Sequence, residues 1–304
     1  MLKNTVIDVG HLHKVYGSNV AVDDVSFQVL DGEIFGLLGL NGAGKTTTVE
    51  CLQGLRRADS GSIRVLGLDP QSDAAELKKL IGSQLQESAL PDRIKVWEAL
   101  DLFASANSAA VDLSTLIEQW GLKEKRNAVF GTLSGGQRQR LLIALALVNN
   151  PKVVFLDEMT TGLDPAARRV TWELIRAIRS RGTTVILVTH FMDEAETLCD
   201  RLAVMHQGKI AALDTPQALI NTHAGAIKVL FSTERTDIDW LKAVPHVHSV
   251  SRRGAKVEVE GDGPVLALVA SELVKRGIVP VDLRKEQPTL EDVFLKITGR
   301  SGNE

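Results

Sequence analysis

Residues 34–53, IFGLLGLNGAGKTTTVECLQ, contain the pattern that decides the fold of this chain. The apolar run Ile34–Leu38 is typical of a strand that is buried on both faces. The next residues, Gly39–Thr46, fit the phosphate-binding loop pattern G-x-x-x-x-G-K-[ST]. A helical pattern follows over roughly Lys45–Gln53. The stretch therefore predicts a strand, an anion-binding loop and a helix in direct succession.

The residue types in this loop suit the oxygens of a polyphosphate. Its glycines allow successive backbone N–H groups to face inward, and the start of the following helix carries partial positive charge. Lys45 supplies a mobile cation for the β- and γ-phosphates, and Thr46 supplies a hydroxyl for Mg²⁺. The alternative is a glycine-rich turn that binds nothing. The apolar strand pattern before the loop and the helical pattern after it favour a nucleotide site over that alternative.

Length and composition describe an ordinary globular protein with room for two domains. The chain has 304 residues, of which 44% are apolar and 24% are charged, and its net charge is −3. This balance predicts one large α/β domain and a smaller one. It does not predict the broad basic surface that nucleic acid or anionic lipid would require.

Neither the cysteines nor the apolar runs indicate an extracellular or membrane-spanning chain. Cys51 and Cys199 lie far apart in helical patterns, which favours buried thiols in a reducing cytoplasm over a disulfide or a metal site. The apolar run Leu141–Val148 is too short to span a bilayer, and Met1–Val9 lacks the pattern of a leader. Work at a membrane would therefore need a separate membrane subunit.

Two features upstream of the loop give further expectations. Asp31 and Gly32 form a tight-turn pattern, which predicts a hairpin between Ser26–Leu30 and Ile34–Leu38. Tyr16, the only tyrosine in the chain, is placed to stack on an adenine ring. A tyrosine at a strand end usually packs against its own sheet, so that alternative stays open.

Downstream of the loop, residues 88–130 show helical patterns without a strand signal, which predicts an inserted helical subdomain. The stretch Leu133–Gln137, LSGGQ, then begins a long helix. Ser134 is a favourable N-cap, and Gly135 and Gly136 expose the N–H groups of the first turn. This helix start is either a second anion site or an ordinary capped helix, and the stretch alone favours neither.

Polar side chains follow two predicted buried strands. Asp157 and Glu158 end the apolar run that begins at Lys152, and His190 follows Val185–Thr189. Ligands of open α/β sheets bind at this edge of the sheet. Asp157 suits a hold on Mg²⁺, Glu158 suits orienting and deprotonating a water, and His190 suits a hydrogen bond to a γ-phosphate. The alternative is that all three are solvated loop residues. For the two carboxylates, the phosphate loop upstream makes this alternative less favoured.

The order of these motifs resembles that of the ATP-binding subunit of an ABC transporter. The resemblance covers residues 1 to about 220. It comprises an adenine-stacking aromatic, Walker A, a Q-loop, the signature, Walker B, a catalytic glutamate, a D-loop and a switch histidine. These are, in order, Tyr16, Gly39–Thr46, Gln86, Leu133–Gln137, Val153–Asp157, Glu158, Asp164 and His190. The signature is nearly diagnostic by itself, and the order of all the motifs is more specific still.

The resemblance implies an α/β P-loop NTPase of the ABC type, with a mixed-sheet core, an antiparallel β subdomain and a helical subdomain. It also implies ATP hydrolysis, with ATP and Mg²⁺ as the bound cofactors. The implied catalytic residues are Lys45, Gln86, Glu158 and His190. The implied nucleotide contacts are Tyr16, Asn41, Gly42, Ala43, Gly44, Lys45, Thr46, Thr47, Ser134, Gly135, Gly136, Gln137 and Asp164. The implied Mg²⁺ ligands are Thr46, Gln86 and Asp157.

In this family the signature helix caps the γ-phosphate held by another subunit, which implies two ATP molecules between head-to-tail domains. Two residues depart from the family pattern. Leu40 replaces a proline in the loop, where little effect is expected because this side chain points away from phosphate. Met159 replaces the proline after the catalytic glutamate, and losing a residue that fixes φ is expected to loosen the position of Glu158. Gln84 lies within a predicted strand, so Gln86 is assigned to the Q-loop.

The segment beyond about His223 lies outside that match, and we predict the domains 1–222, with a helical subdomain over about 88–150, and 223–304. In the second domain, strand and helix patterns in the order β-α-β-β-α-β indicate a small α+β, ferredoxin-like split-βαβ sandwich. The predicted strands are Ala226–Ser232, Val247–Ser251, Val257–Glu260 and Val279–Leu283, and the predicted helices are Asp237–Ala243 and Val265–Arg276. The tail Pro288–Arg300 resembles the tails of ABC-2 drug-exporter ATPases of the daunorubicin group.

These features predict the motor subunit of an exporter, in which ATP binding closes a dimer and hydrolysis reopens it. The cargo that the resemblance implies is a drug or another small molecule or lipid. The expected partners are an integral-membrane permease and a second ATP-binding subunit in a homodimer, with no nucleic acid. The chain would lie in the cytoplasm, on the inner face of the cell membrane, held there by the permease.

Two other functional classes share parts of this pattern. Soluble ABC ATPases of translation carry two cassettes in one chain, and the repair types insert coiled coils or zinc modules between Q-loop and signature. In this chain Gln86 and Leu133 are only 47 positions apart, without heptads or paired cysteines. A small GTPase or a kinase would leave LSGGQ unexplained, and the N-K-x-D motif is missing from the sequence. Export is therefore favoured, while the cargo depends on the membrane subunit.

Overall fold

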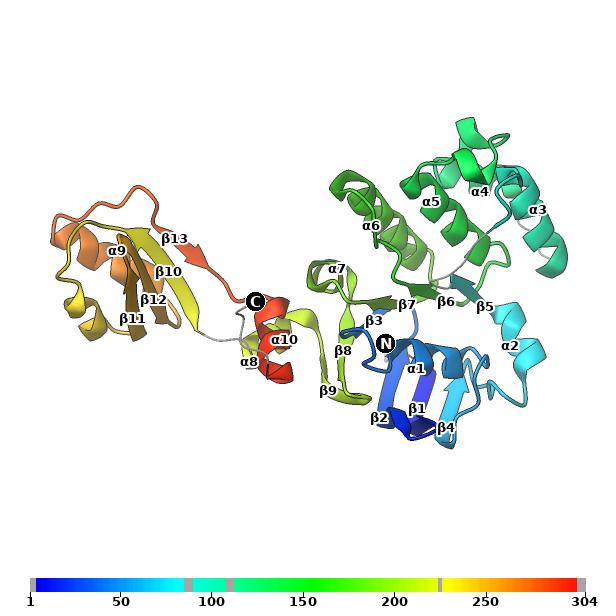
Figure 1. Cartoon of the computed structure of the whole chain (residues 1–304), viewed down its shortest axis with the longest axis horizontal. Helices are drawn as coiled ribbons and strands as arrows, with labels where there is room; N and C mark the ends of the chain where they lie inside the picture. The colour runs from blue at the N-terminus through cyan, green and yellow to red at the C-terminus, as the bar shows by residue number, and fades with distance from the viewer. Residues whose placement is uncertain (1–3, 85–89, 108–111, 224–225, 300–304) are drawn as a thin grey trace. The chain divides into compact units, whose positions relative to one another are not determined.

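The computed structural model describes residues 4–84, 90–107, 112–223 and 226–299. The chain divides into two compact units, unit 1 (Met1–Pro216) and unit 2 (Gln217–Glu304) (Figure 1). The division falls at the start of helix α8 (Pro216–His223), six residues before the boundary predicted from the sequence. Almost all of this helix therefore belongs to unit 2.

The largest sheet of unit 1 has six strands in the order β5-β6-β7-β3-β8-β9. Neighbouring strands are parallel, except that β8 and β9 are antiparallel. Every residue of β3, β6 and β7 is buried, as their apolar sequences predict. The strands span Ile34–Leu38 (β3), Ile81–Gln84 (β5), Val153–Asp157 (β6), Thr184–Thr189 (β7), Arg201–His206 (β8) and Lys209–Asp214 (β9).

A second, antiparallel sheet of unit 1 has the strand order β2-β1-β4, with β1 spanning Thr5–Tyr16, β2 Asn19–Leu30 and β4 Ser60–Val65. The predicted hairpin between Ser26–Leu30 and Ile34–Leu38 is wrong. β2 pairs with β1, whereas β3 lies between β7 and β8 in the six-stranded sheet. The predicted turn after β2 is present, but it passes the chain from one sheet to the other. A wholly apolar strand is stable only where both of its faces are covered, which the six-stranded sheet provides.

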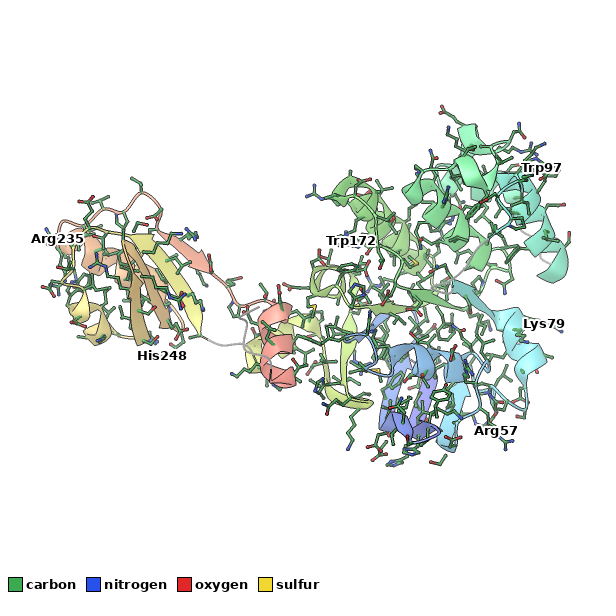
Figure 2. The ribbon with its side chains drawn as sticks, in the orientation of Figure 1. Arg57, Lys79, Trp97, Trp172, Arg235 and His248 are labelled. Carbon is green, nitrogen blue, oxygen red and sulfur yellow. The ribbon has the colours of Figure 1, made fainter. Side chains whose placement is uncertain are left out.

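The helices of unit 1 are α1 (Lys45–Leu52), α2 (Ala74–Leu80), α3 (Val96–Asn107), α4 (Leu113–Gln119), α5 (Gly135–Ala146), α6 (Pro165–Ser180) and α7 (Met192–Leu198). Short 3₁₀ helices occur at Lys123–Lys125 and Phe130–Thr132. Helix α6 packs against β7, and α7 packs against β3 and β7. Figure 2 labels Trp172, which α6 carries. Within the described ranges 90–107 and 112–150, the chain is helical or irregular and no strand is assigned.

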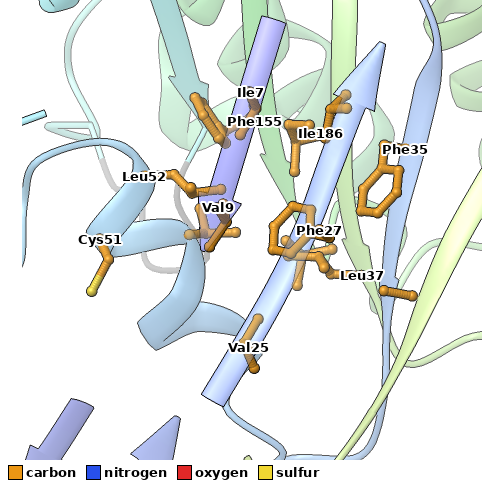
Figure 3. Close-up of a cluster of buried hydrophobic side chains, with 14 of the residues drawn as sticks. Ile7, Val9, Val25, Phe27, Phe35, Leu37, Cys51, Leu52, Phe155 and Ile186 are labelled. Atoms are coloured by element: carbon orange, nitrogen blue, oxygen red, sulfur yellow. The ribbon is translucent and has the colours of Figure 1, made fainter. Parts of the chain in front are cut away.

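The core of unit 1 contains buried side chains from both sheets and from α1 (Figure 3). The rings of Phe27 on β2 and Phe35 on β3 are stacked, with centroids 5.3 Å apart. This contact links a strand of one sheet to a strand of the other. Cys51 and Cys199 are buried and unpaired, as predicted. The phosphate loop therefore connects two elements, β3 and α1, that the core holds in place.

Unit 2 contains one antiparallel sheet with the strand order β11-β12-β10-β13. The strands span Ile227–Ser232 (β10), Val247–Arg253 (β11), Lys256–Gly261 (β12) and Arg284–Glu286 (β13). Its helices after α8 are the 3₁₀ helix Asp239–Ala243, α9 (Val265–Lys275) and α10 (Leu290–Thr298). Apart from the 3₁₀ helix in the first helix position, this order and pairing are those of a split βαβ unit.

One strand of unit 2 was predicted in the wrong place. Residues 279–283 form a loop in which the Val279 side chain is 76% exposed, and the last strand, β13, follows at Arg284–Glu286. Two exposed valines gave this loop its strand-like composition. Across both units, none of the described helices is long and apolar enough to cross a membrane.

Candidate functional site

The phosphate loop connects the end of β3 to the start of α1. Gly42 and Gly44 have φ angles of +81° and +98°, a region that residues with side chains rarely adopt. A Cβ at Gly44 would lie 2.4 Å from the carbonyl oxygen of Ala21, so a larger residue does not fit. Gly44 gives α1 no side-chain cap. The first N–H groups of α1 are therefore available to an anion.

Lys45 bends back over this loop. Its ammonium donates hydrogen bonds to the carbonyl oxygens of Gly39, at 2.8 Å, and Leu40, at 3.0 Å. Only 5% of the residue is exposed. Burial lowers the pKa of the Lys45 ammonium, and the charges of Glu158 and Asp157 oppose that shift. The loop thus holds a cation that two carboxylates face, which suits the β- and γ-phosphates of a nucleotide.

Asp157 ends β6 and is buried beside the loop. Burial, followed by the charge of Glu158, raises its pKa to about 6, while Lys45 and the Thr46 hydroxyl act in the opposite direction. The Oδ1 atom of Asp157 is buried without a hydrogen-bond partner. An unpartnered carboxylate oxygen next to a threonine hydroxyl matches the oxygen ligands of Mg²⁺. These two residues therefore fit a magnesium ion. The third predicted ligand, Gln86, lies outside the described residues.

Glu158 and His190 form a pair at the ends of β6 and β7. The Nδ1 atom of His190 lies 3.0 Å from Oε1 of Glu158. The ring of Phe191 packs on that of His190, with centroids 4.1 Å apart. A carboxylate in this position suits the removal of a proton from a water, with the imidazole as its hydrogen-bond partner.

The turn after β6 is held by packing and backbone hydrogen bonds rather than by a proline. Met159 is fully buried. Glu158 has a φ of +48°, and its N–H donates to the carbonyl oxygen of Val188 at 2.9 Å. The N–H of Thr161 donates to the carbonyl oxygen of Glu158 at 3.4 Å. These contacts oppose the loosening of Glu158 that the missing proline led us to expect.

The phosphate loop and its neighbours line a cavity of 350 Å³. The predicted residues in its walls are Tyr16, Asn41, Gly42, Gly44, Lys45, Thr46, Thr47 and Glu158. Ala43 is instead buried in the core. The walls also contain Asn19 and Ala21, which sequence reasoning missed. A signal for Asn19 was available, because a hairpin turn at Gly17 places it opposite Tyr16.

Tyr16 stands at the end of β1 and is 39% exposed. The Lys14 ammonium and the Arg56 guanidinium lie 5.4 Å and 5.7 Å from its ring centroid. These cation–π contacts fix the ring at the wall of the cavity. The ring therefore lines the cavity of the phosphate loop, and its stacking on adenine stays a prediction.

The signature residues line a different cavity, of 320 Å³. Ser134, Gly135, Gly136 and Asp164 contribute to it, and none of the phosphate-loop residues, all of which are described, does so. The two parts of the predicted nucleotide site are therefore separate within one chain. Asp164 caps α6, because its Oδ1 accepts the N–H groups of Ala166 and Ala167 at 3.0 Å and 2.9 Å.

Ser134 and Gln137 close the start of α5 with a complete capping box. The Ser134 hydroxyl accepts the N–H of Gln137 at 3.3 Å, and the Gln137 side chain accepts the N–H of Ser134 at 3.0 Å. The spacing S-x-x-Q is the sequence pattern of such a box. The sequence left open whether this helix start is an ordinary capped helix or an anion site. The ordinary cap is present, and binding of an anion would be an additional role.

Comparison with known proteins identifies the family. Residues 22–161 match the sequence profile of the family described as ABC transporter. Curated relatives named Nod factor export ATP-binding protein I match nearly the whole chain. The protein from Rhizobium sp. (strain N33) is 38% identical over 98% of this chain and 99% of its own length. The protein from Burkholderia lata is 38% identical over 97% of each chain.

Solved structures of ATP-binding subunits share the fold. One described as the ATP-binding subunit of an ABC transporter is 26% identical, with a TM-score of 0.65 over 71% of this chain and 92% of that one. The cbiO1 protein from Clostridium perfringens, part of the ABC transporter complex cbiONQ, is 25% identical, with a TM-score of 0.66 over 72% and 92%. The predicted fold class is confirmed.

The match along almost the whole length of transport subunits excludes the soluble translation or repair ATPase, and with it the GTPase or kinase. The same match confirms the predicted enzyme class, a transport-coupled ATPase. This chain belongs to the family of ATP-binding subunits of ABC transporters.

Proposed function

We propose that this chain is the motor subunit of an exporter for a drug or another small molecule or lipid. The proposal is carried by the match to relatives named as export ATP-binding proteins, which extends over 98% of this chain and so includes unit 2. The tail Pro288–Arg300, which resembles those of drug-exporter ATPases, supports the same group. The solved cassettes, in contrast, cover about 70% of the chain.

Two copies of the chain in head-to-tail order would account for the two separate cavities. The phosphate-loop cavity and the signature cavity share no lining residue. In this family the signature of one subunit meets the nucleotide of the other, and a homodimer supplies both halves from one sequence. ATP would then be a ligand of the closed dimer and would stabilise it by mass action.

Each residue of the site has a role in this cycle. The N–H groups of the loop and Lys45 bind the β- and γ-phosphates. Bound Mg²⁺, held by Thr46 and Asp157, would neutralise charge on the same phosphates. Glu158 takes a proton from the attacking water, and His190 donates to the γ-phosphate. Hydrolysis would remove the γ-phosphate that the signature helix of the second copy contacts, and the dimer would then open.

An exposed apolar groove supports docking of a membrane permease. Leu55, Ile81 on β5 and Phe103 on α3 contribute to a cavity of 290 Å³. Leu55, Leu102 and Phe103 are 51%, 58% and 37% exposed. Clustered apolar residues on a surface mark protein interaction sites. A permease bound there would hold the chain on the inner face of the membrane and would contact β5.

Purification of the full chain from detergent-solubilised membranes tests the proposal. We expect a hydrophobic polypeptide to co-purify with it and the complex to transport its cargo into inverted vesicles only with ATP. Phe103→Glu should release the polypeptide and leave ATP binding unchanged, and Lys123→Glu on the exposed 3₁₀ turn serves as the control. A chain that purifies alone from membranes, with ATPase activity indifferent to Phe103→Glu, would contradict the exporter assignment.

Unit 2 is proposed to be an accessory domain for regulation or assembly. Every nucleotide residue precedes position 216, so a chain ending at Thr215 should bind ATP within about twofold of the full chain. A second version ending at His223 retains α8, which carries the buried residues Leu219 and Ile220. Loss of transport with ATP binding retained supports the accessory role. If both versions are insoluble, the two units do not fold independently.

A further inference from the structure

Glu194, on α7, is a buried carboxylate with no role in the site described above. It is 0% exposed, although Asp193 and Glu196 on the same helix are exposed. Burial raises the pKa of its carboxyl group. Burying a carboxylate is costly unless its oxygens are hydrogen-bonded. The contacts that compensate this cost therefore indicate what the residue does.

Three polar side chains surround the Glu194 carboxylate. The indole N–H of Trp172 donates to Oε1 at 3.0 Å. The nearby hydroxyls of Thr189 and Thr160 lower the pKa of Glu194 against the effect of burial. Both threonines are fully buried. Glu194 is thus tied to three separate segments of unit 1.

Each of these segments adjoins a residue of the hydrolytic site. Thr160 comes two residues after Glu158, and Thr189 directly precedes His190. Thr189 also accepts the N–H of Phe191 on its Oγ1 at 3.0 Å, so it braces the chain on both sides of His190. Trp172 lies on α6, which begins at the D-loop. Glu194 therefore connects the turn after β6, the end of β7 and α6.

The contact with Thr160 is the least complete of the three. Oε2 of Glu194 and Oγ1 of Thr160 are both buried and have no hydrogen-bond partner of standard geometry. Thr160 nevertheless lies close enough to lower the pKa of Glu194. Thr160 lies in the turn after β6. Glu158, which pairs with His190, is in the same turn.

We propose that Glu194 is a positioning residue for hydrolysis, which acts by holding Thr160 and Thr189. Through them it sets the geometry of the pair formed by Glu158 and His190. It does not line the nucleotide cavity, so it acts on hydrolysis and leaves ATP binding to the phosphate loop. The inference rests on the ATPase cycle of the proposed function.

Glu194→Gln in the full chain tests this role. Glutamine keeps the size and the acceptor for Trp172 but loses the charge, and charge-assisted hydrogen bonds are roughly twice as strong as neutral ones. Since misplacement of a catalytic group by about 1 Å can cost about 10²-fold, we expect kcat to fall about tenfold for Gln and about 10²-fold for Ala. KM and the Kd for ATP should stay within about twofold. Glu196→Gln, an exposed glutamate of the same helix, should leave every value unchanged.

A second measurement follows the geometry of the pair formed by Glu158 and His190 and does not depend on activity. The ring resonance of His190 in an NMR spectrum is identified by its loss in His190→Ala. It should shift in Glu194→Gln at an unchanged Tm, and it should not shift in Glu196→Gln. Unchanged kcat and an unshifted His190 resonance in Glu194→Gln would overturn the proposal. Parallel losses of Tm, Kd and kcat would also overturn it, since they indicate a group needed only for folding. A parent chain without ATPase activity would refute the proposed function, while the His190 resonance still decides the role of Glu194.

Discussion

Two helices of unit 1, α1 and α5, begin at glycine-rich turns. They differ in whether a side chain caps the backbone N–H groups of the first turn. Gly44 precedes α1 with a φ of +98° and provides no side-chain cap. Ser134 precedes α5, where its capping box with Gln137 satisfies donors of the first turn. The start of α1 is therefore open to an anion, whereas the start of α5 is partly closed by its own side chains.

This difference assigns the two motifs to different steps. The cavity at α1 combines uncapped N–H groups and Lys45 with Glu158 in one chain. We expect it to bind ATP without a partner. The cavity at α5 contains Gly135 and Gly136 but no residue of the phosphate loop. We expect it to contribute only when a second subunit brings nucleotide to it.

Lys45→Ala should have the largest effect, because it destroys the site at α1. The ammonium bridges the loop through Gly39 and Leu40 and is the cation for the β- and γ-phosphates. ATP binding and turnover should both become unmeasurable, in the isolated chain and in the complex. Binding is measured with a fluorescent nucleotide, and Lys123→Ala on the surface is the control. ATPase activity near that of the parent would refute the assignment of this loop.

Glu158→Gln should separate binding from hydrolysis. The amide keeps the size of the side chain but cannot accept a proton, and loss of a general base typically costs about 10²–10⁴ in rate. The variant should bind ATP at α1 and hold it against α5 of the second copy. Gel filtration should therefore show a long-lived dimer with ATP and none with ADP. Hydrolysis at the parental rate would require another residue to orient the water.

The residues that carry local chemistry could be predicted from the sequence, and those fixed by distant pairing could not. The loop at Gly39–Thr46 and the two carboxylates at the end of β6 follow from strand-end positions, and the structure places them in or beside one cavity. The hairpin predicted through Asp31 failed because a turn signal does not specify which strands pair. Glu194 was missed because it stands among other acidic residues on α7, and the pattern does not show which of them is buried.

Met159→Pro tests the turn that places Glu158 between the two helix starts. Proline disfavours the α region and favours extended backbone in the residue before it, whereas Glu158 has a φ of +48°. Glu158 should therefore move, and turnover should fall by roughly tenfold with ATP binding retained. Met159→Leu conserves volume and is the matched control. A rise in turnover for Met159→Pro would show instead that the missing proline loosens the native turn.

Ser134→Ala should have the smallest effect, and it acts on α5 alone. Loss of an N-cap serine to alanine costs about 1 kcal/mol, whereas replacement by glycine costs only a few tenths. We therefore expect Ser134→Ala to lower the Tm by about 2–4 °C and Ser134→Gly to leave it nearly unchanged. ATP binding by the isolated chain should be the same as in the parent for both, because Ser134 does not line the cavity at α1.

The two variants also separate capping of α5 from contact with the nucleotide of a second copy. If the Ser134 hydroxyl contacts that nucleotide in the closed dimer, turnover should fall to the same extent in Ser134→Ala and Ser134→Gly, since both remove the hydroxyl. If the hydroxyl serves only as a cap, turnover should follow the Tm, and Ser134→Gly should resemble the parent. Steady-state ATPase assays of the dimeric complex, alongside thermal unfolding of each isolated chain, distinguish these results. Weaker ATP binding by the isolated Ser134→Gly chain would contradict the assignment of α1 and α5 to different nucleotides. It would place the signature at the nucleotide of its own subunit.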